Sequence, residues 1–212
     1  PMLFCVGFIG NFIIGGVTGV FLAAVPVDLI LHDTYYVVGH FHYVIMGAIA
    51  FAVFAGVYYW FPIVSGRMYQ RTLGKAHFWT TMVGTNLTFF AMILLGYGGM
   101  PRRYATYNGV TVEGIVSYFT SLHVLATVGA FILLVGQLIW VWNMVQSWLE
   151  GPVVGPDPWN LEEDGLPSRE FDWHADRLET TLADGGEPAE DEPMTDGGEP
   201  VDADDDDATT DE

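Results

Sequence analysis

Residues 32–44 read HDTYYVVGHFHYV, and they place three histidines and one carboxylate beside a long apolar segment. Ionisable side chains are expensive at membrane depth and usually belong to a functional site. His40 and His42 are two positions apart, which on an α-helix separates them by about 200° because each residue turns by about 100°. The two imidazoles therefore leave opposite sides of one helix. They cannot easily share a metal ion, but each can hold a different one, and electrons can pass between the two centres.

Four apolar segments extend outward from this stretch, and each is long enough to cross a bilayer, which takes about 20 residues. They cover approximately residues 2–25, 36–61, 78–97 and 117–148. We therefore predict an all-α membrane protein with four transmembrane helices. Its helices would contact the lipid bilayer, and we expect no nucleic-acid partner. Glycine is frequent in these segments, as is typical of membrane helices that approach one another closely.

Basic residues predict the orientation of the chain in the cell membrane. The loop after the second segment contains Arg67, Arg71 and Lys75, so the positive-inside rule places it in the cytoplasm. Both chain ends then lie inside, and the loops around residues 32–33 and 98–114 lie outside.

Paired arginines in the second outer loop run against this rule and need another explanation. Arg102 and Arg103 follow a Gly-Met-Pro turn. A guanidinium group binds carboxylates in a bidentate geometry, so this pair predicts the binding of an anion on the same side as the histidines.

The acidity of the chain is concentrated at its C-terminal end. Residues 1–149 contain three acidic and five basic residues, whereas residues 150–212 contain 23 acidic and two basic ones. We divide the chain into a transmembrane region (1–149), a juxtamembrane extension (150–183) and an acidic tail (184–212). The tail has too few apolar residues to fold and is expected to be disordered. Its composition favours a solubilising role over an interaction role, which predicts a halophilic prokaryotic source.

The N-terminal end lies within an apolar run, without the charged region that opens a signal peptide. Pro1 is therefore interpreted as a cut point in a longer protein. Cys5 is the only cysteine, which excludes a disulfide within the chain and a cysteine-based metal cluster.

Haem fits the histidine pair, because haem iron takes an axial imidazole and a flat macrocycle can lie between helices. His40 and His42 on two faces of one helix predict two haems. Arg102 and Arg103 would then neutralise haem propionates.

A second polar group precedes the same helix. His32 and Asp33 together make a partial site for a divalent ion, completed by water or another subunit. Asp28 is close in sequence and is assigned to the same polar layer.

The remaining histidines are interpreted without a ligand role. His77 begins the third segment and is expected to be interfacial. His123 lies inside the fourth segment without an evident partner, and His174 is expected to be solvated in the C-terminal region.

Five motifs resemble the C-terminal third of subunit I of the haem-copper respiratory oxidases, of the cytochrome c oxidase type. The most specific is the stretch quoted above, and the resemblance runs from about Gly15 to Tyr107. The fourth segment is similar only in hydrophobicity, and the tail is not similar. The other motifs are GGVTG (15–19), WFP (60–62), NLTFF (86–90) and GMPRRY (99–104). The resemblance implies four helices from the C-terminal part of a twelve-helix oxidase core.

This resemblance implies a role for each histidine of the pair. His40 would be the axial ligand of the high-spin haem at the oxygen site, and so the catalytic residue of this chain. His42 would be one of two axial ligands of the low-spin haem. Two haems are implied, with haem a expected among them.

The resemblance also implies roles for the outer polar residues. His32 and Asp33 would contact a magnesium or manganese ion at the interface with subunit II. Arg102 and Arg103 would hold haem propionates, and Asp28 would join that layer.

The implied reaction is the four-electron reduction of O2 to water, coupled to proton translocation. Electrons would come from cytochrome c or a copper protein, and the partners would be the rest of subunit I and subunits II and III. The copper-binding histidines, the second low-spin axial histidine and the proton-channel residues belong to the first eight helices of that family. Copper would therefore be bound by the full subunit and not by this chain, which alone should be inactive.

Other functions stay open. A quinol oxidase or a nitric oxide reductase would share these motifs, although Asp33 and Tyr43 favour the cytochrome c type. A non-enzymatic membrane cytochrome with two haems would need further histidines, and only His123 is available. A transporter would need broken helices with internal charges, which the sequence does not indicate beyond the histidine cluster.

Overall fold

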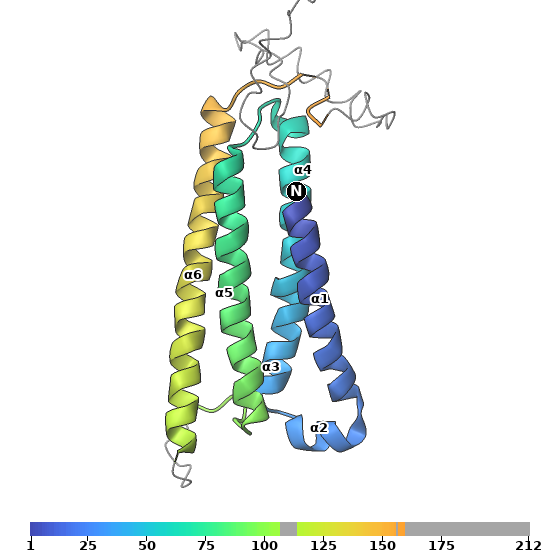
Figure 1. Ribbon diagram of the computed structural model, residues 1–212, viewed down its shortest axis with the longest axis vertical. Helices are drawn as coiled ribbons and strands as arrows, with labels where there is room; N and C mark the ends of the chain where they lie inside the picture. The colour runs from blue at the N-terminus through green and yellow to red at the C-terminus, as the bar shows by residue number, and fades with distance from the viewer. Residues whose placement is uncertain (107–113, 156, 160–212) are drawn as a thin grey trace, which may run out of the picture.

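The computed structural model describes residues 1–106, 114–155 and 157–159, which form long helices running side by side (Figure 1). Within this part of the chain there is no β-strand, only two isolated β-bridges. The elements are α1 (Met2–Ala23), α2 (Val25–Leu31), α3 (Tyr35–His42), the π-helix η1 (Tyr43–Ile49), α4 (Ala50–Ser65), α5 (Arg71–Tyr97) and α6 (Ile115–Glu150).

Four stretches of helix are long and apolar enough to cross a membrane, as predicted. They are α1, α5, α6 and the continuous run of α3, η1 and α4, which together cover Tyr35–Ser65. The predicted all-α fold with four transmembrane helices is therefore confirmed, and the chain is a multi-pass membrane protein.

The helix boundaries differ from the predicted ones where local chemistry overrides hydropathy. The second span continues past Pro62 to Ser65, where Gly66 adopts a left-handed conformation (φ 68°) and ends the helix. The third span begins at Arg71, seven residues earlier than predicted, because long basic side chains near a helix end can extend to the interface.

The short helix α2 was not predicted. The chain turns at Ala24, which is extended, and Pro26 lies in the first turn of the new helix. Proline suits this position because it needs no hydrogen-bond partner for a backbone N–H. Helix α2 crosses the end of the bundle between α1 and α3 (Figure 1).

Glycines bring α5 and α6 into close contact along their length. A Cβ atom at Gly84 would lie 2.6 Å from the backbone nitrogen of Leu133, and one at Gly129 would lie 2.6 Å from Oγ1 of Thr88. Small residues of this kind let membrane helices pack backbone to backbone. Figure 1 shows these two helices side by side, with α1 packed beside η1 and α4 on the other side.

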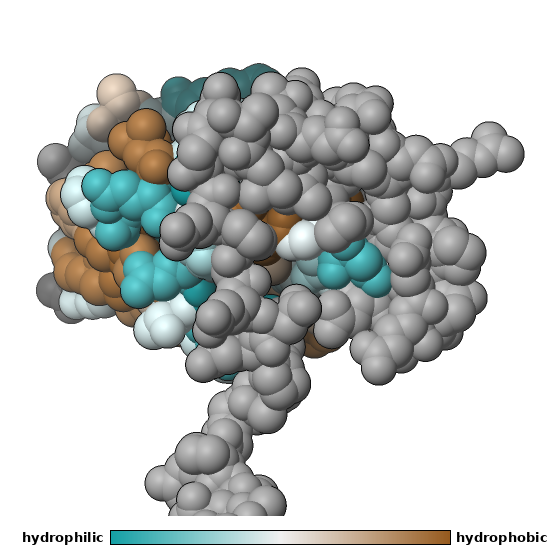
Figure 2. Space-filling view, turned by 90° about the horizontal axis from the view of Figure 1, so that it is seen from above, coloured by the Kyte–Doolittle hydropathy of each residue, from teal (hydrophilic) through white to brown (hydrophobic). Residues whose placement is uncertain are grey.

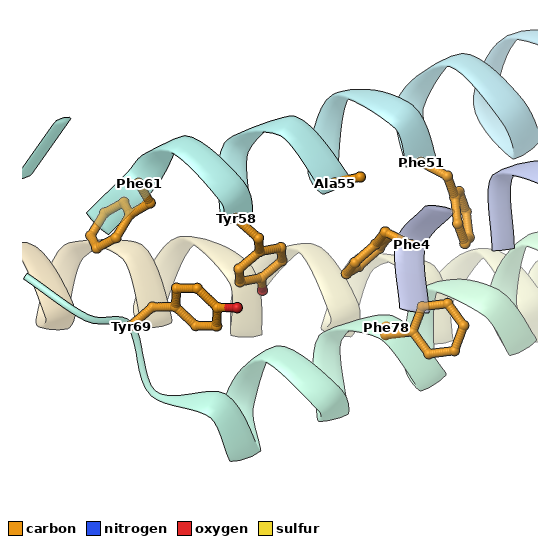
Figure 3. Packing of buried hydrophobic residues seen from close by; sticks show 7 residues of the cluster. All are labelled: Phe4, Phe51, Ala55, Tyr58, Phe61, Tyr69 and Phe78. Atoms are coloured by element: carbon orange, nitrogen blue, oxygen red, sulfur yellow. The ribbon is translucent and has the colours of Figure 1, made fainter. Parts of the chain in front are cut away.

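An aromatic cluster fills the other end of the bundle, between α1, α4 and α5 (Figure 3). Its members are the buried residues Phe4, Phe51, Ala55, Tyr58, Phe61, Tyr69 and Phe78. His77 lies against this cluster and is fully buried, with its Nδ1 3.0 Å from the hydroxyl of Tyr58. The expectation that His77 begins the third segment is therefore wrong, because α5 begins six residues before it, whereas its interfacial depth stays a prediction.

The α4–α5 loop and the chain after α6 meet at this end of the bundle. The guanidinium group of Arg67 donates to the carbonyl of Gly151 at 2.7 Å. Asn143 accepts a hydrogen bond from the backbone N–H of Gln70 at 3.1 Å and donates to its carbonyl at 3.2 Å. Burial raises the pKa of Tyr69 in the same loop to about 12. Figure 2 looks onto this end, where hydrophilic residues lie beside apolar ones of the flank.

The chain ends and loops are divided between the two ends of the helical bundle as the sequence predicts. The N-terminal end of α1, the basic loop and the C-terminal end of α6 lie together, and the loops with Asp33 and Arg102 lie at the opposite end (Figure 1). Which end faces the cytoplasm stays a prediction. Almost all of the proposed extension (150–183) and the whole tail (184–212), with His174, lie outside the described residues.

Candidate functional site

His40 lies on α3 and faces α1. Its Nδ1 is 3.0 Å from the carbonyl of Gly15 and 3.0 Å from the hydroxyl of Thr18, and that hydroxyl donates to the same carbonyl at 2.7 Å. A carbonyl oxygen only accepts hydrogen bonds, and the hydroxyl proton of Thr18 is already used. Nδ1 of His40 therefore carries the proton, and Nε2 keeps the lone pair that can bind a metal ion.

His42 faces the opposite neighbour, α5. Its Nδ1 donates to the carbonyl of Val38 at 2.8 Å, so Nε2 again keeps its lone pair. The ring lies between aromatic neighbours, with centroid distances of 4.6 Å to Phe41 and 5.0 Å to Phe89. The contacts of the two imidazoles with different helices agree with the arrangement predicted from their spacing.

Glycine at position 19 explains how α1 comes so close to His40. A Cβ atom at Gly19 would lie 2.8 Å from Cε1 of His40, which real Cβ contacts essentially never show. Three residues of the GGVTG motif, Gly15, Thr18 and Gly19, thus contact or face this ring. The motif thus packs against Nδ1 and Cε1 of the imidazole, and a Cβ atom at Gly19 would also lie 3.5 Å from Nε2.

The donor set of this site suits haem iron. A metal-binding histidine usually donates its second ring N–H to a carbonyl, which fixes the tautomer and the ring orientation. Both His40 and His42 have this arrangement. In the described part of the chain, no group of three or more His, Cys, Asp or Glu side chains could hold a metal ion. Each imidazole therefore offers one protein ligand, as an axial site on a macrocycle requires.

Arg102 and Asp33 form an ion pair at the α2 end of the bundle. Nε of Arg102 donates to Oδ1 of Asp33 at 2.7 Å, and the backbone N–H of Arg102 donates to the carbonyl of Asp33 at 2.9 Å. Arg103 is farther away, with 4.0 Å between its Nη1 and the same carboxylate oxygen. Asp33 (φ 56°) and Arg103 (φ 69°) both adopt left-handed backbone conformations, which are uncommon for residues other than glycine.

His32 lies between two carboxylates of the same polar layer. Its Nδ1 is 3.5 Å from Asp28, and its Nε2 is 3.8 Å from Asp33. The structure thus brings together the three residues that the sequence assigned to this layer. Because the imidazole lies between the carboxylates and Asp33 already pairs with Arg102, the remaining ligands of a metal ion here would have to come from water or another chain.

The ion pair predicts how Asp33 titrates. The hydrogen bond from Arg102 holds the pKa of Asp33 below its ordinary value of 3.8. Because the folded-state pKa is lowered, the stabilising pair is present above pH 3.8 and is lost as the pH falls through the lower folded value. We expect Arg102→Gln to raise this pKa toward 3.8 and Arg103→Gln to raise it less. Infrared titration of the complete complex, with Asp33→Asn subtracted as the reference, measures both shifts, and an unchanged pKa in Arg102→Gln would contradict the assignment.

His123 has a partner that the sequence did not indicate. Its Nε2 is 3.2 Å from the sulfur atom of Met100, and its ring makes an edge contact with Tyr35, with centroids 5.8 Å apart. The expectation that His123 lacks a partner is therefore wrong. Met100 belongs to the loop between α5 and α6, and it packs against Phe119 and Leu122 of α6 only because the loop folds back onto that helix.

Several functional neighbours were missed in the sequence. Thr18 was quoted only as part of a motif, and Phe89 only within NLTFF. Asn86 was quoted only within the same motif, yet it accepts a hydrogen bond from Tyr43 at 3.0 Å. Its position within an apolar span was the available signal, since a polar amide there needs partners.

Comparison with known protein families identifies the family to which these motifs belong. The family model described as cytochrome C and quinol oxidase polypeptide I matches residues 1–132. The chain belongs to this oxidase family. The match reaches beyond the range of 15–107 inferred from motifs and takes in all of α1 and half of α6.

Two relatives show the sequence identity of this oxidase polypeptide to curated proteins and the share of each protein that the match covers. Cytochrome c oxidase polypeptide 1 of Halobacterium salinarum is 60% identical over 205 residues, which cover 95% of this chain and 33% of that protein. Cytochrome c oxidase subunit 1 of Synechocystis is 49% identical over 158 residues, which cover 74% of this chain and 27% of that protein. The chain thus spans about a third of the length of these oxidase relatives. The first match reaches into the C-terminal region, where motifs had indicated no resemblance.

A solved structure agrees with the fold of this oxidase polypeptide. It is titled as a cryo-EM structure of a heme-copper terminal oxidase dimer, and it matches with a TM-score of 0.59 at 23% sequence identity. The match covers 85% of this chain and 34% of the other. At this identity the likeness supports the helix arrangement.

Proposed function

We propose that this chain is the C-terminal part of the catalytic subunit of a terminal respiratory oxidase, which reduces O2 to water and couples that reaction to proton translocation. The observation that carries the proposal is the pair His40 and His42. Both imidazoles have Nδ1 bound to a carbonyl and Nε2 left with its lone pair, and they face different helices. The membership of the oxidase family and the relatives named cytochrome c oxidase support it.

His40 and His42 would hold two haems, with haem a expected among them. Haem iron supplies reversible electron transfer and, where one axial position is open, a site for oxygen. His40 would bind the high-spin haem at the oxygen site, where Thr18 and Gly15 keep its ring in one orientation. His42 would bind the low-spin haem, with its ring supported by Phe89. Copper would be held by parts of the full subunit that this chain does not include.

The outer polar layer would serve the propionates and a divalent ion. Arg102 and Arg103 would neutralise propionates, with Asp28 in the same layer, and Asp33 keeps Arg102 in place through the 2.7 Å hydrogen bond. His32 and Asp33 would contact magnesium or manganese at the surface that meets subunit II.

The electron donor in this proposal is cytochrome c or a copper protein, and the remaining partners are the rest of subunit I and subunits II and III. A quinol donor is the second candidate, because the matching family model covers both cytochrome c and quinol oxidases. The relatives named cytochrome c oxidase favour the first.

The proposed location is the cell membrane of a halophilic prokaryote, with the acidic tail in the cytoplasm. Arg67 in the α4–α5 loop and Arg71 at the start of α5 support this orientation. The relative from Halobacterium salinarum supports the source.

Purification of the native complex through this chain tests the proposal. We expect reduced-minus-oxidised spectra with low-spin haem bands, a carbon monoxide shift from a high-spin haem, and oxygen consumption with a reduced cytochrome c or copper-protein donor. Oxygen consumption with quinol alone would favour the second candidate. A complex without any haem would contradict both.

A further inference from the structure

The second membrane span changes its helix type at the residue after His42. Helix α3 ends at His42, and η1 continues from Tyr43 to Ile49 as a π-helix before α4 begins. π-Helices are rare and often accompany functional sites. Something in the surroundings of η1 must therefore favour the wider turn over an ordinary α-helix.

A ring of hydrogen bonds begins and ends in this π-helix. The hydroxyl of Tyr43 donates to the amide oxygen of Asn86 on α5 at 3.0 Å. The amide nitrogen of Asn86 donates to the amide oxygen of Asn11 on α1 at 3.3 Å. The amide nitrogen of Asn11 donates to the carbonyl of Gly47, again in η1, at 3.0 Å. The ring thus ties α1, α5 and η1 together.

Burial makes this ring costly to break. Tyr43 and Asn11 are fully buried, and Asn86 is half-buried. The second N–H of the Asn86 amide has its own acceptor, the carbonyl of Met82 at 2.9 Å. A buried polar group that loses its partner costs about 1–3 kcal/mol, so each member depends on the other two.

Close packing joins the ring to the candidate haem ligands. A Cβ atom at Gly47 would lie 3.2 Å from Cβ of Asn11, and one at Gly15 would lie 3.3 Å from Cβ of Tyr43. Gly15 also offers the carbonyl that accepts from His40. The contact of α1 with η1 therefore shares a residue with the contact that orients His40.

We propose that Asn11, Tyr43 and Asn86 are positioning residues, whose hydrogen-bond ring holds η1 in its π-helical form. By doing so, the ring fixes the rotation of α3 about its axis. His40 then keeps facing α1, and His42 keeps facing α5. This inference rests on the proposed function, because it assigns the ring to the orientation of two haem-binding imidazoles.

Two variants of the complete oxidase test the ring. Tyr43→Phe removes one hydroxyl with little change in packing volume. Asn86→Ala removes both the acceptor of the Tyr43 hydroxyl and the donor to the amide oxygen of Asn11. We expect both variants to shift the electron paramagnetic resonance g-values and the midpoint potential of the low-spin haem, with the larger shift in Asn86→Ala. We expect Tyr43→Phe to retain both haems, so that the shift reports orientation and not loss.

Thr88→Val is the matched control on α5. Its buried hydroxyl donates to Gly84 at 2.8 Å and lies toward α6, so its loss leaves the ring intact and the g-values unchanged. Unchanged g-values in Tyr43→Phe and Asn86→Ala, or an equal shift in Thr88→Val, would overturn the inference.

The variant His42→Ala separates this inference from the proposed function. If the low-spin haem signal survives that replacement, the ligand assignment fails. If the signal is lost in His42→Ala but is the same in Tyr43→Phe as in the natural chain, only the positioning role fails.

Discussion

Replacing His40 by Ala in the full-length subunit is expected to abolish carbon monoxide binding and oxygen reduction. The imidazole would be the axial ligand that this chain gives to the high-spin haem, and its Nε2 is kept free by the hydrogen bonds of Nδ1 to Gly15 and Thr18. Loss of a partner that only orients a ligand already costs about 10–100-fold in affinity or activity. Loss of the ligand itself should therefore exceed about 100-fold. Carbon monoxide difference spectra and oxygen consumption of the purified complex measure the effect.

His123→Ala is the control for this prediction. His123 lies in the same bundle, but its Nε2 is 3.2 Å from the sulfur atom of Met100, and no haem is assigned to it. We expect its replacement to leave the carbon monoxide band in place. A His40→Ala variant that keeps the full band and full activity would show that His40 is not the ligand.

Gly96→Ala is expected to cause the largest loss of stability among glycine-to-alanine substitutions in the described part of the bundle. A Cβ atom at Gly96 would overlap the backbone nitrogen and Cα of Tyr36, and a backbone cannot swing away as a side chain can. Inserting atoms into a well-packed contact typically costs about 1–3 kcal/mol, and this overlap lies at the upper end of that range. Because Gly96 joins α5 to the helix that contains both histidines, we expect a lower unfolding temperature and loss of haem in thermal denaturation of the complex.

Gly74→Ala is the matched control on the same helix. A Cβ atom there would lie 3.4 Å from ring atoms of Tyr58 and Tyr69, which is ordinary contact. Alanine also favours the helix over glycine by about 1 kcal/mol. Equal unfolding temperatures for Gly74→Ala and Gly96→Ala would contradict the close contact of α5 with α3.

The helical spans and the opposed histidines could be predicted because both depend on local properties. Apolar length alone identifies a membrane span, and the rotation of about 100° per residue separates His40 from His42. The shared polar layer of Asp28, His32 and Asp33 could also be predicted, since these residues lie within six positions of one another.

The tertiary partners of the site could not be predicted in the same way. Thr18, Phe89 and Met100 reach their histidines across 22, 47 and 23 positions of sequence. Nothing in the apolar pattern of residues 43–49 distinguishes a π-helix from an α-helix, because the difference depends on contacts with Asn11 and Asn86. The start of the third span was misplaced for another reason: Arg71 and Lys75 were assigned to a loop, although they belong to the first turns of α5.

A cryo-EM density map of the complete oxidase that contains this chain tests directly whether His40 and His42 bind two different haems. We expect one haem iron at Nε2 of His40 and a second haem iron at Nε2 of His42, on different faces of α3. Density that places both imidazoles on one metal ion, or that leaves either Nε2 without iron, would contradict this assignment.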